Sequence, residues 1–470
     1  MSDRQHLVHT FTQGAISRRT FVSRALALGL SMSAVETVLA ACGGSGNAGS
    51  SGPTTVNFTT WGGTGQYAHW RDLIAANDPA IKDIHLHVTV GGQGDTDVAA
   101  KLRLALSSGK NIPDVIQLNR TGLAEFASSG QIATLDDVYA SIKNDIYPGA
   151  LDLVSYQGKS YAIPYEVKSK IFFYRADLFD QANIKVENIH SIDDFINAGK
   201  ELHGKFPKAY ILNLGPQPAG YWLGELLSAY PDALMADTSG NYQVTKHPAF
   251  ADSFQFLKQL YDSKIALPID DWSNDWQQSF NTQTIAGSLI GNWMKFFLPG
   301  FAPQQKGLWK LAPWPQFSPL KDQRYGAEGG GSIYVFPVRA PHSQQAITLF
   351  SHMFLTVKSS TTIFQSGGTP PVFNSAKSQV ESILSQRPAG IADKDWNATP
   401  QVFFGNSYIE TEFQTYNYVK PFNYDPQAAK EFGILNLWLQ KYVSGKVPLT
   451  QALAGAENDM KTQIGNPYSQ

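Results

Sequence analysis

Cysteine is almost absent from this sequence, and its scarcity excludes two kinds of protein. Cys42 is the only cysteine among 470 residues, so the chain has neither a disulfide framework nor a thiolate metal site. An excess of one charge is missing as well, because 37 basic and 39 acidic residues leave a net charge of −2. The sequence therefore gives no reason to expect nucleic acid or another polyanion as a partner.

Catalytic signatures and long apolar segments are also missing. No G-x-S-x-G or H-E-x-x-H motif occurs, and the ten histidines are scattered, so neither a serine hydrolase nor a zinc protease is predicted. An apolar run near the N-terminus, residues 25–35, is too short for a membrane-spanning helix, which needs about 20 residues. We expect no metal and no cofactor.

The length and the aromatic content describe the body of the chain. A chain of 470 residues is longer than one typical core, which predicts two domains or one large composite. Aromatic residues make up 12% of the chain and charged residues only 16%. This balance favours a globular protein with a surface on which ligands can stack.

The first residues are typical of an export and anchoring segment. Residues 17–22 (Ser-Arg-Arg-Thr-Phe-Val) resemble a twin-arginine signal, and residues 39–42 (Leu-Ala-Ala-Cys) resemble a bacterial lipoprotein box. The resemblance implies that residues 1–41 are removed and that Cys42 carries a lipid and becomes the new N-terminus. The alternative is that Cys42 is a buried structural cysteine. The Gly/Ser-rich residues 42–53 then form a flexible tether.

The beginning of the body alternates between strand and helix patterns. The strands are predicted at 56–61, 84–90 and 113–118, and the helices at 67–77 and 95–108. Asp95 or Thr96 is expected to cap the second helix, and Gly109 to end it. This β-α-β-α-β order predicts a parallel sheet with helices on both faces. Ligands of such sheets bind beyond the carboxyl ends of the strands.

Residues 161–178 are the stretch around which the rest of the chain is organised. Pro164 favours extended backbone before it, and the apolar residues 171–174 predict a short buried strand. The charged residues Glu166, Lys168 and Lys170 lie between these two parts, with no helical face to carry them. The stretch is either a crossing between two lobes or a polar loop between two strands of one sheet, and by itself it does not decide.

Several short motifs, taken in order, resemble one family. They are Pro-Asp-Val at 113–115, Gly-Lys-Ser-Tyr-Ala-Ile-Pro at 158–164, Ile-Phe-Phe-Tyr at 171–174, Gly-Asn-Trp at 291–293 and Gly-Gly-Gly at 329–331. Together they are similar to the extracellular solute-binding proteins of family 1, the sugar-type receptors of ATP-binding-cassette importers. Arg175 departs from the family pattern, which often has Asn at this position.

This resemblance implies the fold and the lobes. The fold class is α/β, in the two-lobed arrangement of type II periplasmic binding proteins, with parallel-type sheets, helices on both faces and a ligand cleft between the lobes. The N-terminal lobe is expected to comprise residues 54–167 and 334–371, and the C-terminal lobe residues 168–333 and 372–470. The stretch 161–178 is then interpreted as a crossing at the floor of the cleft.

Sugar recognition needs aromatic faces for the C–H side of the ring and polar groups for the hydroxyls. Four tryptophans are expected to contact the ligand, although any of them could instead pack in the core: Trp61, Trp222, Trp276 and Trp293. The polar and backbone contacts are expected from Asn119, Glu166, Lys168, Glu328 and Gly330.

The favoured function is a lipid-anchored receptor at the extracytoplasmic face of a bacterial cell membrane. We expect a monomer that captures a carbohydrate and delivers it to the permease subunits of an importer, and not an enzyme. One alternative keeps the fold but binds a polyamine, peptide or phosphodiester, and the acids Asp270, Asp271 and Asp275 could serve a polyamine. A second alternative is an exported glycosidase, which needs two carboxylates across the scissile bond.

Overall fold

The structure is a computed structural model of the whole chain. It describes residues 53–62, 64–216, 221–230, 232–314, 331–387, 391–417 and 419–469. The chain divides into two compact units, Met1–Pro53 and Thr54–Gln470, and the second of them is described below. Cys42, the predicted signal segment and nearly all of the tether lie outside the described residues.

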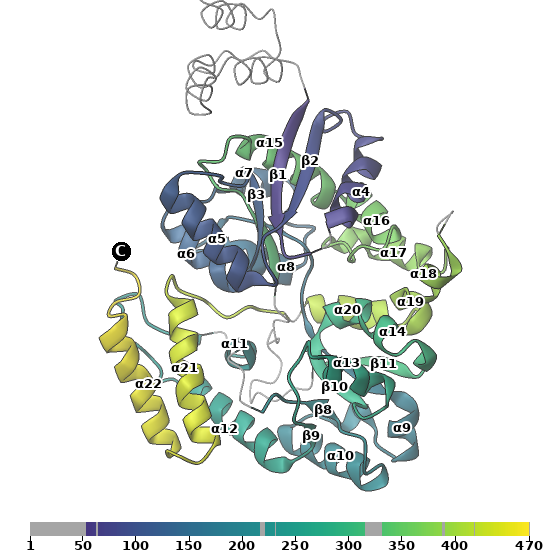
Figure 1. Cartoon of the computed structure of the whole chain (residues 1–470), viewed down its shortest axis with the longest axis vertical. Helices are drawn as coiled ribbons and strands as arrows, with labels where there is room; N and C mark the ends of the chain where they lie inside the picture. Colours follow the sequence, from purple (N-terminus) through teal and green to yellow (C-terminus); the bar gives the residue numbers. More distant parts are fainter. Residues whose placement is uncertain are drawn as a thin grey trace, which may run out of the picture. The chain divides into compact units, whose positions relative to one another are not determined.

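The first sheet has five strands in the order β2-β1-β3-β12-β6. The strands β1 (Thr54–Thr60), β2 (Ile84–Val90) and β3 (Val115–Asn119) run parallel to one another. The helices α4 (Thr64–Ala75) and α5 (Asp95–Ser108) connect them (Figure 1). The predicted β-α-β-α-β order is therefore confirmed.

Helix α5 begins differently from the prediction. Its N-cap residue is Gly94, which makes no side-chain capping bond, so the expectation that Asp95 or Thr96 caps the helix is wrong. The Asp95 carboxylate instead accepts a hydrogen bond from the backbone N–H of Asn119 at 2.6 Å, because the helix begins beside the carboxyl end of β3. Gly109 ends the helix in the left-handed region, as predicted, with a φ of 67°.

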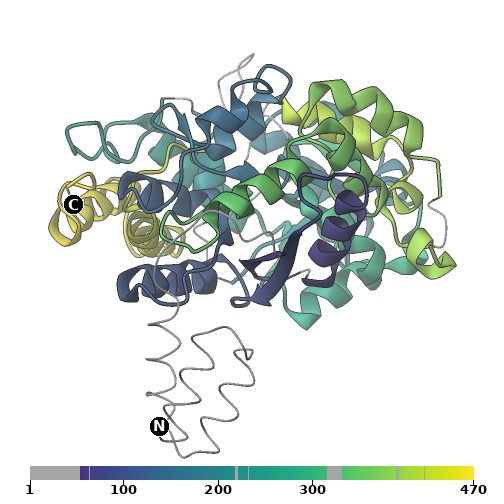
Figure 2. The same ribbon diagram turned by 90° about the horizontal axis from the view of Figure 1, so that it is seen from above.

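Two later strands complete the first sheet. β12 (Ser332–Val335) runs antiparallel to β3 and to β6 (Ile163–Pro164). Helix α15 (Ser343–Phe354), which follows β12, contacts β1, β3 and α4. Seen from above, the green α15 lies among purple and blue elements that come much earlier in the chain (Figure 2).

The second sheet has three strands in the order β10-β7-β11. β7 (Lys170–Arg175) runs antiparallel to both β10 (Gly287–Gly291) and β11 (Trp309–Pro313). Beside β10 lies the parallel pair β8 (Leu212–Asn213) and β9 (Ala266–Leu267). The first sheet is thus mixed, and the strand pairs of the second sheet are antiparallel, where parallel-type sheets were expected.

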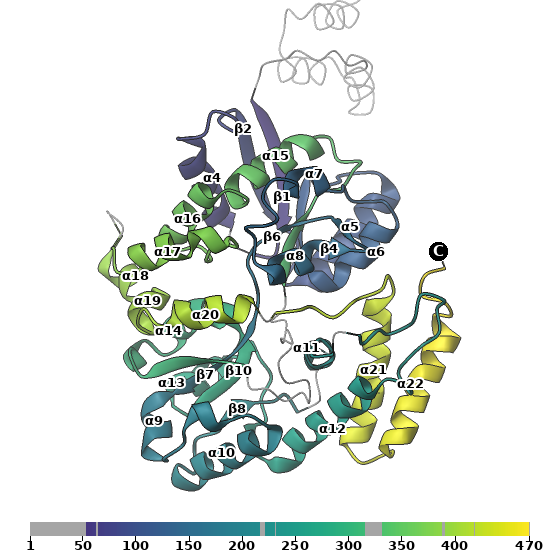
Figure 3. The same ribbon diagram turned by 180° about the vertical axis from the view of Figure 1, so that it is seen from behind.

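Strand β7 lies between two hydrophobic cores, and its side chains point alternately into one and the other. Ile171 and Phe173 belong to a core that also contains Trp70, Trp276 and the residues of the first sheet, whereas Phe172 belongs to the other core. Successive side chains of a strand point to opposite faces, so each face of β7 is covered. The second core is built largely by α10 (Ile192–Lys205), α12 (Pro248–Ser263), α21 (Ala428–Val443) and α22 (Leu449–Gln463) (Figure 3).

The remaining helices cover these sheets or connect them. Their bounds are α6 (Leu123–Ser128), α7 (Asp136–Tyr139), α8 (Pro148–Val154), α9 (Ala176–Gln181), α11 (Tyr221–Leu227), α13 (Asn274–Asn281), α14 (Leu298–Phe301), α16 (Val357–Gln365), α17 (Lys377–Ile383), α18 (Asp393–Asn397), α19 (Pro400–Phe403) and α20 (Tyr408–Tyr416). A small hairpin pairs β4 (Ser155–Tyr156) with β5 (Lys159–Ser160). Within the described residues, no helix has both the length and the apolar character needed to cross a membrane.

Candidate ligand-binding site

The carboxyl edge of the first sheet gathers residues from four strands. Trp61 follows β1, Gly91 follows β2, and Asn119 ends β3. The antiparallel β12 begins at this same edge with Ser332, which pairs with Asn119. Trp61 and Asn119 are half-buried, whereas Ser332 is fully buried.

The second sheet has a comparable edge. β10 and β11 both end there, followed by Asn292 and Trp314, while β7 begins there with Lys170. The bridge between Tyr210 and Ile285 is parallel, so β8 and β9 also point their carboxyl ends to this edge. The segment after β9 leads to Trp272. The second sheet and the adjacent pair β8–β9 therefore place strand ends at one common edge.

A short crossing joins the two edges. The chain leaves the first sheet after Pro164 and enters the second at Lys170, and an extended segment of this length spans at most about 20 Å. The crossing pairs with both edges, because Tyr165 N–H donates to Ser332 O at 3.1 Å and Asn292 N–H donates to Ser169 O at 2.8 Å. The two carboxyl edges consequently meet at residues 165–169.

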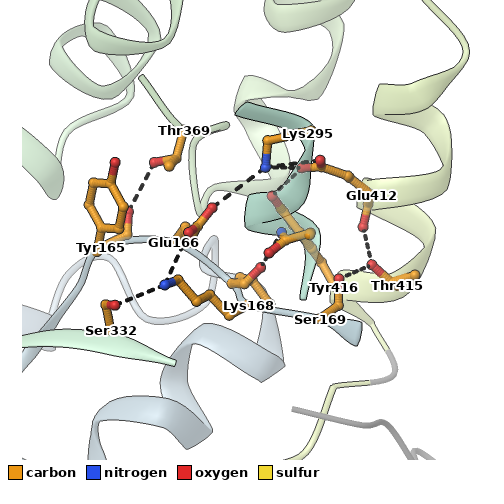
Figure 4. A network of polar contacts seen from close by, with 12 residues as sticks. Tyr165, Glu166, Lys168, Ser169, Lys295, Ser332, Thr369, Glu412, Thr415 and Tyr416 are labelled. Atoms are coloured by element: carbon orange, nitrogen blue, oxygen red, sulfur yellow. Dashed lines mark hydrogen bonds and ion pairs between the residues drawn. The ribbon is translucent and has the colours of Figure 1, made fainter. Parts of the chain in front are cut away.

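A buried network of charges holds the crossing (Figure 4). Glu166 is 1% exposed, and its carboxylate lies 3.7 Å from the Lys168 ammonium and 3.6 Å from the Lys295 ammonium. Lys295 also contacts Glu412 of α20 at 3.0 Å, and Lys168 donates to Ser332 Oγ at 3.0 Å. Two carboxylates and two ammonium groups thus neutralise one another between the first sheet, the crossing and α20.

Burial dominates the electrostatics of this network. It raises the pKa of Glu412, and Lys295 opposes that shift as the nearest cation. Tyr416 donates to Glu412 Oε2 at 3.1 Å, and Thr415 donates to Ser169 Oγ at 2.7 Å. Such buried pairs are costly to break, because the remaining charge stays in a medium of low polarity. These buried contacts therefore fix the conformation of the crossing.

An exposed group of aromatic rings lies beside the crossing. Trp293 belongs to the 3-10 helix η3 (Asn292–Phe296), the same short helix that carries Lys295. Its ring stacks on Trp272, with centroids 5.0 Å apart and planes inclined by 20°, and Phe297 packs edge-on against both. Trp272 is 53% exposed and Phe297 39% exposed. These three residues are called the aromatic platform below.

The backbone at Trp272 is strained. Its φ of 67° lies in the left-handed region, which a bulky side chain adopts only when its surroundings impose it. The neighbouring Asp271 is fixed by a hydrogen bond from Asn213 Nδ2 at 2.7 Å. An exposed indole held by strained backbone is a feature of binding surfaces more than of cores.

Comparison with known proteins agrees with this geometry. A family model described as bacterial extracellular solute-binding protein matches residues 78–403. The chain belongs to this family. Its members act outside the cytoplasm, and the location of this solute-binding protein is accordingly extracytoplasmic.

Individual relatives support the two-lobed fold. The lactose-binding protein of Rhizobium radiobacter is 23% identical over 278 residues, which are 55% of this chain and 61% of that protein. A binding protein of an ABC transporter from B. animalis subsp. lactis Bl-04, solved in complex with beta-1,6-galactobiose, has a TM-score of 0.67 at 23% identity and covers 88% of this chain and 99% of its own. The galacto-N-biose-/lacto-N-biose I-binding protein of Bifidobacterium longum, solved with lacto-N-biose, has a TM-score of 0.69 at 20% identity, with coverages of 89% and 99%.

The residues predicted from the sequence occupy different environments in this solute-binding protein. Trp61 and Asn119 lie at the carboxyl edge of the first sheet, Glu166 and Lys168 lie in the crossing, and Trp293 lies in the aromatic platform. Glu328 and Gly330 fall outside the described residues.

Two of the predicted tryptophans are enclosed. Trp222 is 3% exposed, and the Lys170 ammonium covers its ring at 3.4 Å from the centroid. Trp276 is fully buried, donates its indole N–H to Asn213 Oδ1 at 3.0 Å and packs on Phe280. Trp276 therefore offers no open face in this structure, and the ligand contact expected of it stays a prediction. The exposed face in this segment is that of Trp272.

Three residues of the site carried too little sequence signal to be selected. Trp272 shares a polar segment with Trp276, and its positive φ cannot be read from the sequence. Lys170 and Trp314 lie at opposite ends of the sequence of the second sheet and meet only because β7 and β11 pair. Among the described residues, no group of three or more His, Cys, Asp or Glu side chains lies together in an arrangement suited to a metal ion.

Proposed function

We propose that this solute-binding protein captures a carbohydrate at the facing carboxyl edges of its two sheets and delivers it to an ABC importer. The observation that carries the proposal is the aromatic platform of Trp272, Trp293 and Phe297 next to a crossing whose charges are already neutralised. Indole faces cover the apolar side of a sugar ring, and an electrically balanced crossing suits an uncharged ligand. The sugar ligands named for the relatives support the same class of solute.

The polar contacts of the proposed site come from the edge of the first sheet. Asn119 is half-buried there and can reach a hydroxyl with its amide group. Trp61 is the corresponding aromatic residue of that edge, and Lys168 is the half-buried cation of the crossing. Glu166 contributes through the two lysines that it holds. The lobe boundaries near residues 167, 333 and 371 are part of this proposal, as is closure of the lobes around the ligand.

A binding role without catalysis is part of the same proposal. The carboxylates Glu166 and Glu412 at the crossing are both buried and both paired with Lys295. A glycosidase needs one carboxyl group as acid and another as base or nucleophile, both in contact with the substrate. We propose that these carboxylates are structural and that the chain acts as a monomeric receptor.

The anchor belongs to the proposal as well. We propose that Cys42 carries the lipid and that residues 42–53 tether the receptor to the extracytoplasmic face of the membrane, beside the permease. Replacement of Cys42 by Ser should move the protein from the membrane fraction to the soluble fraction. Membrane association that survives this replacement would contradict the lipid anchor.

A thermal-shift screen with mono- and oligosaccharides tests the ligand class. A sugar that binds the folded state alone raises the melting temperature by mass action, and isothermal titration then gives its dissociation constant. Trp293→Ala should lower the affinity for that sugar. Trp396→Ala is the control and should leave the affinity unchanged, because Trp396 is a half-buried tryptophan of α18 outside both edges. Stabilisation by a polyamine, peptide or phosphodiester and by no sugar would refute the carbohydrate assignment. Release of product from a glycoside would refute the binding role.

A further inference from the structure

One lysine of the second edge is enclosed by aromatic rings. The ammonium of Lys170 lies 3.4 Å from the ring centroid of Trp222 and 4.9 Å from that of Trp314. The two indoles lie 5.9 Å apart and are inclined by 49°, so they form two walls around the cation. The Glu225 carboxylate forms an ion pair with the same ammonium. The side chain of Lys170 is 1% exposed.

This arrangement has the composition of a binding site for a cationic ligand. Indole faces attract cations through their negative faces, and sites that bind ligand ammonium groups combine such faces into a cage. A carboxylate at the open side adds a charge-assisted hydrogen bond. Trp222, Trp314 and Glu225 supply both elements, and we call them the ammonium cage. Here the occupant is a side chain of the chain itself.

The ammonium cage lies at the edge where the ligand is proposed to bind. Lys170 is the first residue of β7 and pairs with Gly291, the last residue of β10, which immediately precedes η3 and the aromatic platform. Trp314 directly follows β11 at the same edge. The charge of Asp271, the residue before Trp272, acts on Lys170. The cage and the platform therefore belong to one surface of the second sheet.

We propose that Lys170 determines the charge specificity of this receptor, because it occupies the ammonium cage and so excludes solutes that bind through an ammonium group. The proposal rests on the proposed function and restricts its ligand to an uncharged solute that carries hydroxyl groups. Exclusion works through occupancy and not through net repulsion, since Glu225 neutralises Lys170. A sugar stacked on Trp272 or Trp293 does not need the cage.

Lys170 stays in the ammonium cage because it is covalently part of the chain. Lys170 is held in place by the ladder hydrogen bonds of β7, so its ammonium is present at a very high effective concentration compared with an amine in solution. Free amines consequently do not compete with it. Removal of the side chain beyond Cβ should leave a cavity that fits propylammonium, which has the three carbons and the nitrogen that are lost.

The test compares the wild type with Lys170→Ala and Lys170→Met, using thermal shift and tryptophan fluorescence. The probes are propylammonium chloride and putrescine dihydrochloride, each measured against sodium chloride at equal ionic strength and against 1-propanol. We expect propylammonium and putrescine to stabilise Lys170→Ala saturably and to change its fluorescence. The wild type and Lys170→Met, whose cage is filled, should respond as they do to salt. The affinity of Lys170→Ala for propylammonium should exceed that of the wild type by about tenfold or more.

Lys441→Ala is the matched control. The ammonium of Lys441 lies 3.5 Å from the ring centroid of Trp438, nearly the distance of Lys170 from Trp222, but both residues are half-buried on α21. Loss of this lysine should create no response to propylammonium. An equal response of Lys441→Ala and Lys170→Ala would overturn the proposal.

The measurement on the wild type tests the proposal even if Lys170→Ala does not fold. Saturable stabilisation of the wild type by putrescine or propylammonium, beyond the effect of salt, would show that the receptor accepts ammonium groups and would overturn the proposal. Failure of every sugar in the screen would instead refute the proposed function and leave the amine result standing. The two failures are thus distinguishable in the same assay.

Discussion

Replacement of Lys295 by Met tests whether the crossing depends on its buried charges. The Lys295 ammonium is fully buried, 3.0 Å from Glu412 and 3.6 Å from Glu166 (Figure 4). With an effective dielectric constant of about 20, each attraction amounts to roughly 5 kcal/mol before the cost of desolvation. Methionine is similar in length but leaves two carboxylates without their shared cation. Since loss of one partner from a buried pair typically costs about 3–5 kcal/mol, we expect that loss in the free energy of unfolding at neutral pH.

The stability deficit of Lys295→Met should depend on pH. Burial already raises the pKa of Glu412, and the variant loses the cation that opposes this shift. A carboxyl group whose folded pKa is raised keeps its proton in the folded state while the unfolded state loses it. Stability is then greatest below the unfolded pKa and falls as the pH rises through the folded pKa. The deficit of Lys295→Met should therefore be smaller near about pH 5 than near about pH 8.

Urea denaturation followed by circular dichroism measures the deficit at each pH. Lys377→Met is the control, because Lys377 forms an exposed pair with Glu381 at 3.9 Å, and such pairs contribute about 0–1 kcal/mol. The double variant Lys295→Met/Glu412→Gln should recover part of the loss, since one of the stranded charges is removed. A deficit of less than about 1 kcal/mol for Lys295→Met, or one that does not change with pH, would refute this account of the crossing.

Three further predictions concern other parts of the molecule. Trp272→Ala should raise the dissociation constant of a bound sugar by about tenfold in titration calorimetry. It should not lower the stability of the fold, because the ring is 53% exposed. An unchanged dissociation constant would show that Trp272 is not part of the site. Burial raises the pKa of Glu431 from 4.5 to about 10, so through this group the stability of the wild type should fall with a steady slope as the pH rises between these values. Glu431→Gln should flatten that slope in urea denaturation, and an unaltered slope would contradict the assignment. Gly287→Ala should destabilise the second sheet by about 1–3 kcal/mol, since the new Cβ would lie 2.4 Å from Ile211 O. Gly300→Ala, which meets nothing within 4 Å, should cost far less in the same assay.

The elements of the first sheet could be predicted because their signals are local. Residues 84–90 alternate in polarity, and the structure has β2 at Ile84–Val90. The helix predicted at 95–108 agrees with α5, including its end at Gly109. Each of these elements is specified by neighbours within a few turns of chain. The crossing was also marked locally, by Pro164 and by charges between two apolar runs.

The antiparallel direction of β7 and β12 was not predicted, because no local pattern encodes it. The apolar residues 171–174 read equally well as a parallel or an antiparallel strand. β7 runs antiparallel to β10 and β11 because the chain enters the second sheet at the edge towards which those two strands run. That constraint comes from the position of the crossing.

The sequence by itself thus determined the α/β class, the order of the first elements, the family and the place of the crossing. Only the tertiary structure decided which tryptophans are exposed and which charges are neutralised. Trp272 and Trp276 are four residues apart in one polar segment, yet one is 53% exposed and the other is fully buried. Lys295 meets Glu412 across 117 positions of sequence, and Lys170 meets Glu225 across 55. Such contacts depend on how distant elements pack, so neither periodicity nor composition records them.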